Sequence, residues 1–133
     1  MQAVLITGAA SGIGRDTARL FAREGWQCVL VDRNEAALQA LQAELPCSAS
    51  AAHVLQAVDL TDPAQVARLG EGTPALDAIL NNAGMSDPSG MPLAEQDAAQ
   101  MARLLALNLQ APAAVVDACA HRLKPGARIV NVS

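Results

Sequence analysis

The sequence predicts an α/β fold, a doubly wound parallel sheet that carries helices on both of its faces. Apolar runs typical of strands alternate along the chain with segments of helical periodicity. Most of the runs are continuous rather than alternating, as expected for strands buried on both faces. The 133 residues have the length of one ordinary domain, and 52% of them are hydrophobic, which is enough for a sizeable core.

Five predicted strands alternate with four predicted helices. The strands are expected at residues 4–7, 28–31, 53–59, 78–80 and 129–132, and the helices at about residues 13–21, 38–45, 63 onward and 93–123. The third strand has the weakest pattern because it contains Gln56, a feature typical of an edge strand. The last helix is expected to bend near Pro112, and Pro125 and Gly126 to form a turn before the fifth strand.

The most informative segment, TGAASGIG at residues 7–14, lies between the first strand and the first helix. Gly8 can adopt backbone angles that other residues avoid, and Gly12 and Gly14 remove side chains where a pyrophosphate and the neighbouring strand would come close. Free N–H groups at the helix start then face the phosphates. An ordinary glycine turn is the alternative, which this order of strand, turn and helix disfavours. The residues expected to bind a nucleotide cofactor are Thr7, Gly8, Ser11, Gly12, Ile13 and Gly14.

Polar residues stand at or just beyond the end of each predicted strand. They are Thr7, Asp32, Asp59, Asn81 and Ser133. Because the carboxyl ends of parallel strands meet at one edge of the sheet, these residues predict a single ligand site there. The Asp32 carboxylate can accept both hydroxyls of an adenine ribose and repels a 2′-phosphate, whereas Arg33 could attract one. We expect Asp32 to dominate and to favour NAD over NADP; a helix-capping role for Asp32 is a compatible alternative.

The combination of motifs resembles the short-chain dehydrogenase/reductase family. It comprises the glycine turn, Asp59, the run Asn81-Asn82-Ala83-Gly84, Asn108 within Leu107-Asn108-Leu109, and the closing segment IVNVS at residues 129–133. The resemblance extends from Val4 onward. It implies a Rossmann-type NAD(P)-binding domain over residues 1–133, with strand order 3-2-1-4-5 and truncated after the fifth strand.

The resemblance also implies individual roles. Asp59 would bind the adenine amino group with Leu60 beside it, or else initiate the next helix, a role that Thr61 or Asp62 could fill instead. Residues 82–84 would line the cofactor near its ribose and would also brace the sheet as a turn. Asn108 would be the catalytic-site residue that bends its helix and holds a proton-relay water; the alternative is a surface residue on an amphipathic helix.

The catalytic groups that the resemblance implies are incomplete in this chain. The family's proton donor is the tyrosine of a Tyr-x-x-x-Lys motif, but the sequence contains no tyrosine. Its one lysine, Lys124, lies in the predicted turn before the fifth strand and not in such a motif. By the family's register, Ser133 is the first of two serines, of which the second is catalytic. We therefore expect the cofactor-binding part of an NAD-dependent oxidoreductase that interconverts a small-molecule alcohol and a carbonyl, inactive on its own. The alternative is a non-catalytic NAD-binding regulatory or scaffold protein that ends near residue 133.

Charge, cysteine and histidine content limit the partners and the location. The net charge of −4 argues against nucleic acid or an anionic membrane, and no stretch approaches the ~20 apolar residues of a membrane span. The predicted strand near the N-terminus leaves no room for a signal peptide. His53 and His121 lack metal-ligand spacing and are expected to be exposed. We expect no metal, a cytoplasmic location favoured by three widely spaced cysteines, and a homodimer or homotetramer.

Overall fold

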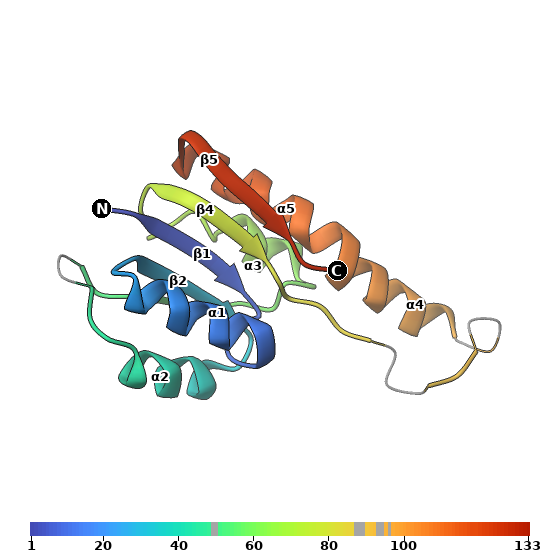
Figure 1. Cartoon of the computed structure of the whole chain (residues 1–133). Coiled ribbons are helices and arrows are strands. Elements are labelled where there is room, and N and C mark those ends of the chain that lie inside the picture. Colours follow the sequence, from blue (N-terminus) through green and yellow to red (C-terminus); the bar gives the residue numbers. More distant parts are fainter. Residues whose placement is uncertain (49–50, 87–89, 93–94, 96) are drawn as a thin grey trace.

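A five-stranded parallel sheet forms the centre of the computed structural model, which describes residues 1–48, 51–86, 90–92, 95 and 97–133. The strands are β1 (Ala3–Thr7), β2 (Gln27–Asp32), β3 (Val54–Ala57), β4 (Leu76–Asn81) and β5 (Leu123–Asn131). Their order is β3-β2-β1-β4-β5, and every neighbouring pair is parallel. Figure 1 shows β2, β1, β4 and β5 side by side. The predicted fold class and strand order are therefore confirmed.

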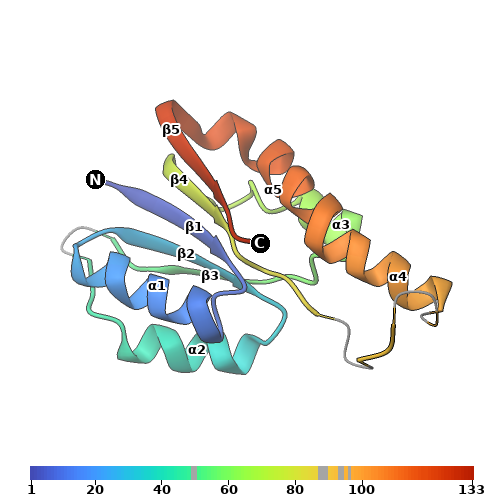
Figure 2. The same cartoon turned by 45° about the vertical axis from the view of Figure 1, so that its right-hand side comes forward.

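Helices cover both faces of this sheet (Figure 2). On one face, α1 (Gly12–Arg23) and α2 (Glu35–Glu44) pack on alternate strand residues that include Val4, Ile6 and Leu30. On the other face, α3 (Pro63–Ala67) and α5 (Ala111–Cys119) pack on a second cluster that includes Leu5 and Ile79. Successive strand side chains point to opposite faces, so both faces need apolar residues, and this explains the continuous apolar runs.

The long helical stretch is divided by a π-helical turn. It consists of α4 (Ala98–Leu105), the π turn η2 (Ala106–Gln110), α5 and the short 3₁₀ helix η3 (Ala120–Arg122). Pro112 has no N–H to donate to the carbonyl of Asn108, which accounts for an irregular turn at the predicted place. The stretch starts later than expected, at Ala98, because Asp97 caps it by accepting the N–H of Gln100 at 2.7 Å. Leu93, the expected start, lies outside the described residues.

One run of this stretch, Ala98–Arg122, is apolar and long enough to cross a membrane by length and composition alone. The core helix of a soluble protein passes the same test. This finding differs from our expectation that no stretch approaches a membrane span. Its residues Ala111, Val115 and Cys119 are buried in the core cluster on one face of the sheet.

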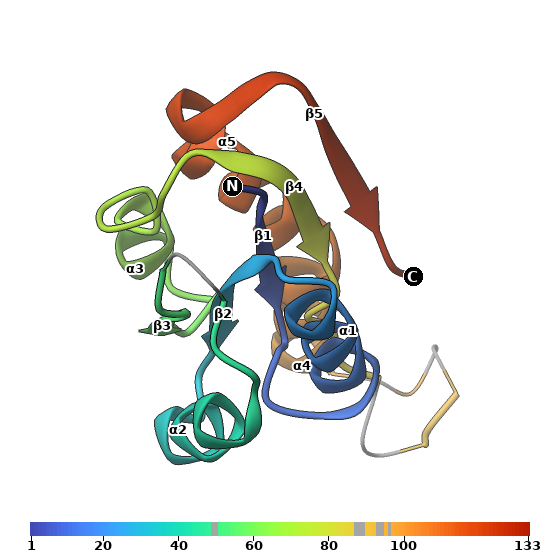
Figure 3. The same cartoon turned by 60° about the vertical axis from the view of Figure 1, so that its left-hand side comes forward.

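Strand β5 begins earlier than predicted. Leu123 already pairs with Leu76, and the next pair is Arg128 with Ala78, so the segment between them bulges out of the ladder. Gly126, with φ of +81°, lies in this bulge, where we expected a complete turn. Figure 3 shows β5 at the outer edge of the sheet, away from α1 and α2, and Val130 in it is 48% exposed.

His53 contradicts the expectation of an exposed side chain. It is buried, with 7% of its surface exposed. Its Nδ1 accepts the N–H of Cys28 at 3.0 Å, and its Nε2 lies 3.0 Å from the carbonyl oxygen of Pro46. Because β3 starts only at Val54, the ring takes the place of a strand partner for Cys28. His121 is exposed, as expected.

Candidate functional site

An open cleft of about 750 Å³ lies at the carboxyl edge of the sheet. Its walls come from the segments that follow β1, β2, β3 and β4, and from α4 and η2. Figure 1 shows α4 extending beyond the strand ends on this side. The predicted residues that line it are Gly8, Ser11, Gly12, Ile13, Asp32, Arg33, Asp59, Leu60, Asn82, Ala83 and Gly84. Thr7, Gly14 and Asn108 are not in the lining.

The glycine turn between β1 and α1 forms one wall. Gly8 and Gly12 have φ of +64° and +53°, and a Cβ on Gly8 would lie 2.9 Å from the Cα of Ala83. A Cβ on Gly14 would collide with the carbonyl oxygen of Gly8, whereas one on Gly12 would meet nothing and point into open space. These glycines therefore let the chain fold tightly and leave the space before the helix clear.

The start of α1 suits an anion. Ser11 is the N-cap residue, its side chain makes no capping hydrogen bond, and the first turn holds no acidic residue. The first N–H groups of the helix thus have no capping side chain, and the helix dipole adds positive potential at the same end. A pyrophosphate fits this end of the cleft chemically.

Asp32 ends β2 beside the glycine turn. Its Oδ2 accepts the N–H of Ala10 at 3.1 Å, and its Oδ1 accepts the N–H of Asn34 at 3.0 Å. Asn34, rather than Asp32, caps α2 by accepting the N–H of Ala37 at 3.0 Å. Asp32 is therefore held at the rim by two backbone donors, with Arg33 next to it in the cleft lining. Each carboxylate oxygen has further lone pairs for hydroxyl donors.

Asp59 lies after β3, across the cleft. Its Oδ1 accepts both the hydroxyl of Thr61 at 2.6 Å and the N–H of Thr61 at 2.9 Å. These hydrogen bonds, and to a smaller extent the nearby charge of Arg33, hold the pKa of Asp59 below its usual value despite the opposing effect of burial. Asp62 caps α3 by accepting the N–H of Ala64 at 3.0 Å, so Asp59 is not needed for that role.

Thr7 and Asn82 join β1 to the segment after β4. The hydroxyl oxygen of Thr7 accepts the N–H groups of Asn82 and Ala83, each at 3.0 Å. Asn82 Nδ2 donates to the carbonyl oxygens of Thr7 at 3.2 Å and Gly8 at 3.4 Å. Thr7 is 2% exposed and stands behind the cleft wall, where it fixes the residues that line it.

Asn108 lies in the π turn and holds Met85. Its Oδ1 accepts the N–H of Met85 at 2.9 Å, and its Nδ2 donates to the Met85 carbonyl at 2.7 Å. The amide therefore fixes the backbone that follows Gly84, at one end of the cleft. A catalytic role for Asn108 stays a prediction.

Several cleft residues are absent from the sequence-based set, namely Val58, Thr61, Met85, Gln100, Arg103 and Leu107. The first three are sequence neighbours of predicted residues. The last three have the spacing of one helix face, i, i+3 and i+7. That periodicity is the signal that could have identified them, although it does not say which face meets the cleft.

Lys124 and Ser133 lie outside the lining of the cleft. Lys124 Nζ donates to Asp77 Oδ2 at 2.7 Å and to the Met1 carbonyl oxygen at 2.8 Å, beside the start of β1 and far from the cleft edge. Ser133 is exposed and follows β5. In the part of the chain that the structure describes, no group of three or more His, Cys, Asp or Glu side chains could hold a metal ion.

Comparisons with known proteins find similar sequences over nearly the whole chain. A family model described as short chain dehydrogenase matches residues 2–133. The chain is 37% identical over 126 residues to a 1-deoxy-11-beta-hydroxypentalenate dehydrogenase of Streptomyces arenae, covering 92% of this chain and 44% of that relative. It thus spans less than half of this relative's length.

Two solved structures share the fold. A short-chain dehydrogenase from Sphingobium yanoikuyae in complex with NADPH is 37% identical, with a TM-score of 0.80, over 92% of this chain and 48% of its own. A metagenomic short-chain oxidoreductase in complex with NADP is 31% identical, with a TM-score of 0.84, over 99% of this chain and 62% of its own.

Proposed function

Since this chain belongs to the short-chain dehydrogenase family, we propose that the full-length protein is an NAD-dependent oxidoreductase that interconverts a small-molecule alcohol and a carbonyl compound. These residues form its cofactor-binding part. The observation that carries the proposal is the cleft of about 750 Å³ between the open glycine turn and the two carboxylates at the ends of β2 and β3.

Each wall of the cleft has a role in this proposal. The N–H groups at the start of α1 bind the pyrophosphate, and Asp32 accepts the adenosine ribose hydroxyls. Asp59 and Leu60 hold the adenine, while residues 82–84 position the other ribose. The bound nicotinamide supplies the hydride chemistry. Asn108 fixes the wall at Met85 and, as the resemblance implies, holds a water for proton transfer.

The preference for NAD rests on Asp32. Its carboxylate is fixed at the rim by hydrogen bonds from the N–H groups of Ala10 and Asn34. A 2′-phosphate bound there would be repelled by a negative charge whose side chain is held in one orientation. The two structural relatives hold NADP and NADPH, and Arg33 is the residue here that could attract a 2′-phosphate. We propose that Asp32 outweighs Arg33 because the carboxylate is held in place by two hydrogen bonds.

The experiment follows cofactor reduction by absorbance in the full-length protein with NAD and with a panel of alcohols. Turnover with NAD is expected, and none by the 133-residue polypeptide alone, because loss of the proton donor costs about 10²–10⁴-fold. Gly14→Val should abolish binding, since any Cβ there meets the Gly8 carbonyl. Turnover by the short polypeptide, or unchanged binding by Gly14→Val, would contradict the proposal.

A second candidate is a non-catalytic NAD-binding regulatory or scaffold protein, which would hold the nucleotide in the same cleft without turnover. The coding frame after Ser133 discriminates the two. A continuation with a second serine and then Tyr-x-x-x-Lys supports the enzyme, and a stop codon supports the regulator. We further propose a cytoplasmic location, consistent with three free cysteines, and a homodimer or homotetramer.

A further inference from the structure

Arg103 and Gln100 form a part of the cleft wall to which no role has been assigned. Both line the cleft, and Arg103 Nη2 donates to Gln100 Oε1 at 2.6 Å. This hydrogen bond between residues three apart on α4 restrains the guanidinium plane. Among the described residues, no carboxylate pairs with Arg103.

Leu107 and the segment after β3 line the same cleft. That segment contributes Val58, Asp59, Leu60 and Thr61 to the lining, and Leu107 is partly buried against the large core cluster to which Val58 and Leu60 belong. Arg103 lies one helical turn before Leu107 on the same face. The Arg103 wall thus lines the same cleft as Asp59 and Leu60, the residues that our proposed function assigns to adenine.

Among the described residues, no aromatic ring lines the cleft. The chain has one phenylalanine, one tryptophan and no tyrosine. Phe21 and Trp26 pack edge to face, with ring centroids 4.9 Å apart, against the cluster under α1 and α2. A planar guanidinium can stack on a base where no aromatic ring is available.

We propose that Arg103, restrained by Gln100, stacks on the adenine ring of the cofactor and closes the α4 side of the adenine pocket, with Leu107 as the apolar neighbour. The inference rests on the proposed function, because it requires an adenine dinucleotide in the cleft. It makes Arg103 a binding residue for the adenosine half and assigns it no contact with the nicotinamide half.

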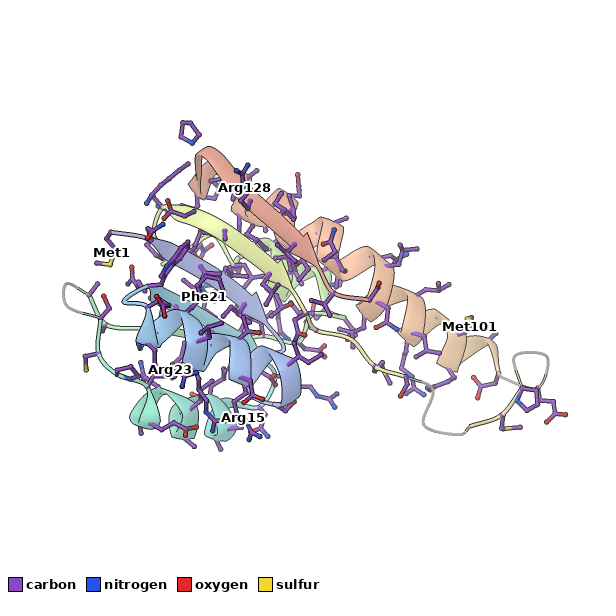
Figure 4. The ribbon with its side chains drawn as sticks, in the orientation of Figure 1. Met1, Arg15, Phe21, Arg23, Met101 and Arg128 are labelled. Carbon is purple, nitrogen blue, oxygen red and sulfur yellow. The ribbon has the colours of Figure 1, made fainter. Side chains whose placement is uncertain are left out.

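The test measures affinities in the full-length protein by calorimetry for ADP-ribose, which contains the adenine, and for nicotinamide mononucleotide, which lacks it. Arg103→Met keeps an unbranched apolar side chain and removes the planar cation; Arg103→Lys keeps the charge without the plane. Arg23→Met on α1 is the matched control. Figure 4 labels Arg23 and Met101, a near neighbour of Arg103, and places them far apart, as does the separation of α1 and α4 in Figure 2.

We expect Arg103→Met to weaken ADP-ribose binding about 3- to 30-fold, the range of a cation–π contact. The affinity of this variant for nicotinamide mononucleotide should not change, and Arg23→Met should not change the affinity for ADP-ribose. Arg103→Lys should recover only part of the loss. Unchanged ADP-ribose binding by Arg103→Met, equal weakening of both ligands, or full recovery by Arg103→Lys would overturn the stacking role and leave the proposed function intact. Failure of the unsubstituted protein to bind ADP-ribose would instead overturn the proposed function.

Discussion

Thr7 and Asn82 are joined by two hydrogen bonds, and Asn82 is the donor in both. The Thr7 hydroxyl oxygen accepts the Asn82 N–H at 3.0 Å, and Asn82 Nδ2 donates to the Thr7 carbonyl at 3.2 Å. The same hydroxyl accepts the Ala83 N–H. Two loops that line the cleft are thereby fixed to each other, although the two residues are 75 positions apart in the chain.

Replacing Thr7 tests this connection. Thr7→Val keeps the shape but leaves the N–H groups of Asn82 and Ala83 without their acceptor, and should lower the free energy of unfolding by about 1–3 kcal/mol. Urea unfolding of the full-length protein measures the change. Thr7→Ser, which retains the hydroxyl, should lose less, and Thr17→Val on α1 is the control. Equal stability of Thr7→Val and Thr17→Val would contradict the bracing role.

Asp77 predicts a pH dependence at the opposite edge of the sheet. Burial alone would raise the pKa of Asp77, but hydrogen bonds from Lys124 Nζ and the Ala3 N–H, with the Lys124 charge, outweigh it and hold the pKa below its usual value. A carboxyl group with a lowered pKa in the folded state contributes stability above its unfolded pKa of about 3.9, and loses it as the pH falls through the folded pKa.

Asp77→Asn should therefore destabilise the protein near pH 7 by about 1 kcal/mol or less, because the pair is partly exposed. The difference should shrink as the pH falls below about 4. Denaturant unfolding of both proteins between pH 7 and pH 3 checks this. A difference that is constant over the whole range would show that the charge of Asp77 is not the source.

His53 provides a third test, of the β2–β3 edge. His53→Leu removes the acceptor for the buried Cys28 N–H and the partner of the Pro46 carbonyl, so a loss of about 1–3 kcal/mol is expected. The exposed His121→Leu is the matched control and should change the free energy of unfolding by less than about 0.5 kcal/mol. Both are measured by thermal and urea unfolding. Similar losses in the two variants would contradict the strand-partner role of His53.

The sequence predicted those parts of the fold and cleft that depend on local chemistry. The glycine turn, the apolar strands and Asp32 could be identified because each feature is continuous in the chain or follows a strand directly. The wall formed by Gln100 and Arg103 could not, since helical periodicity does not show which face meets the cleft. The burial of His53 could not be predicted either. It depends on a tertiary contact in which the ring replaces a strand partner, and such a contact leaves no pattern in the neighbouring sequence.

The extent of β5 and the surroundings of Asn108 were missed for a related reason. Leu123 joins β4 only across a bulge, and strand periodicity does not extend through Pro125 and Gly126. The sequence predicts a bend near Pro112 and, by the resemblance, at Asn108, but not that the bend takes the form of a π turn. The hydrogen bonds of Asn108 to Met85 join segments 23 positions apart, which no spacing rule connects.

The most direct test of the account is the pair of dissociation constants of the full-length protein for NAD and NADP, measured by calorimetry at one ionic strength. With Asp32 fixed at the rim, we predict that NAD binds at least about tenfold more tightly than NADP, equivalent to ~1.4 kcal/mol. Asp32→Ala should weaken the binding of NAD and reduce the difference between the two dissociation constants. Tighter binding of NADP by the unsubstituted protein would contradict the role of Asp32, and binding of neither cofactor would contradict the assignment of the cleft.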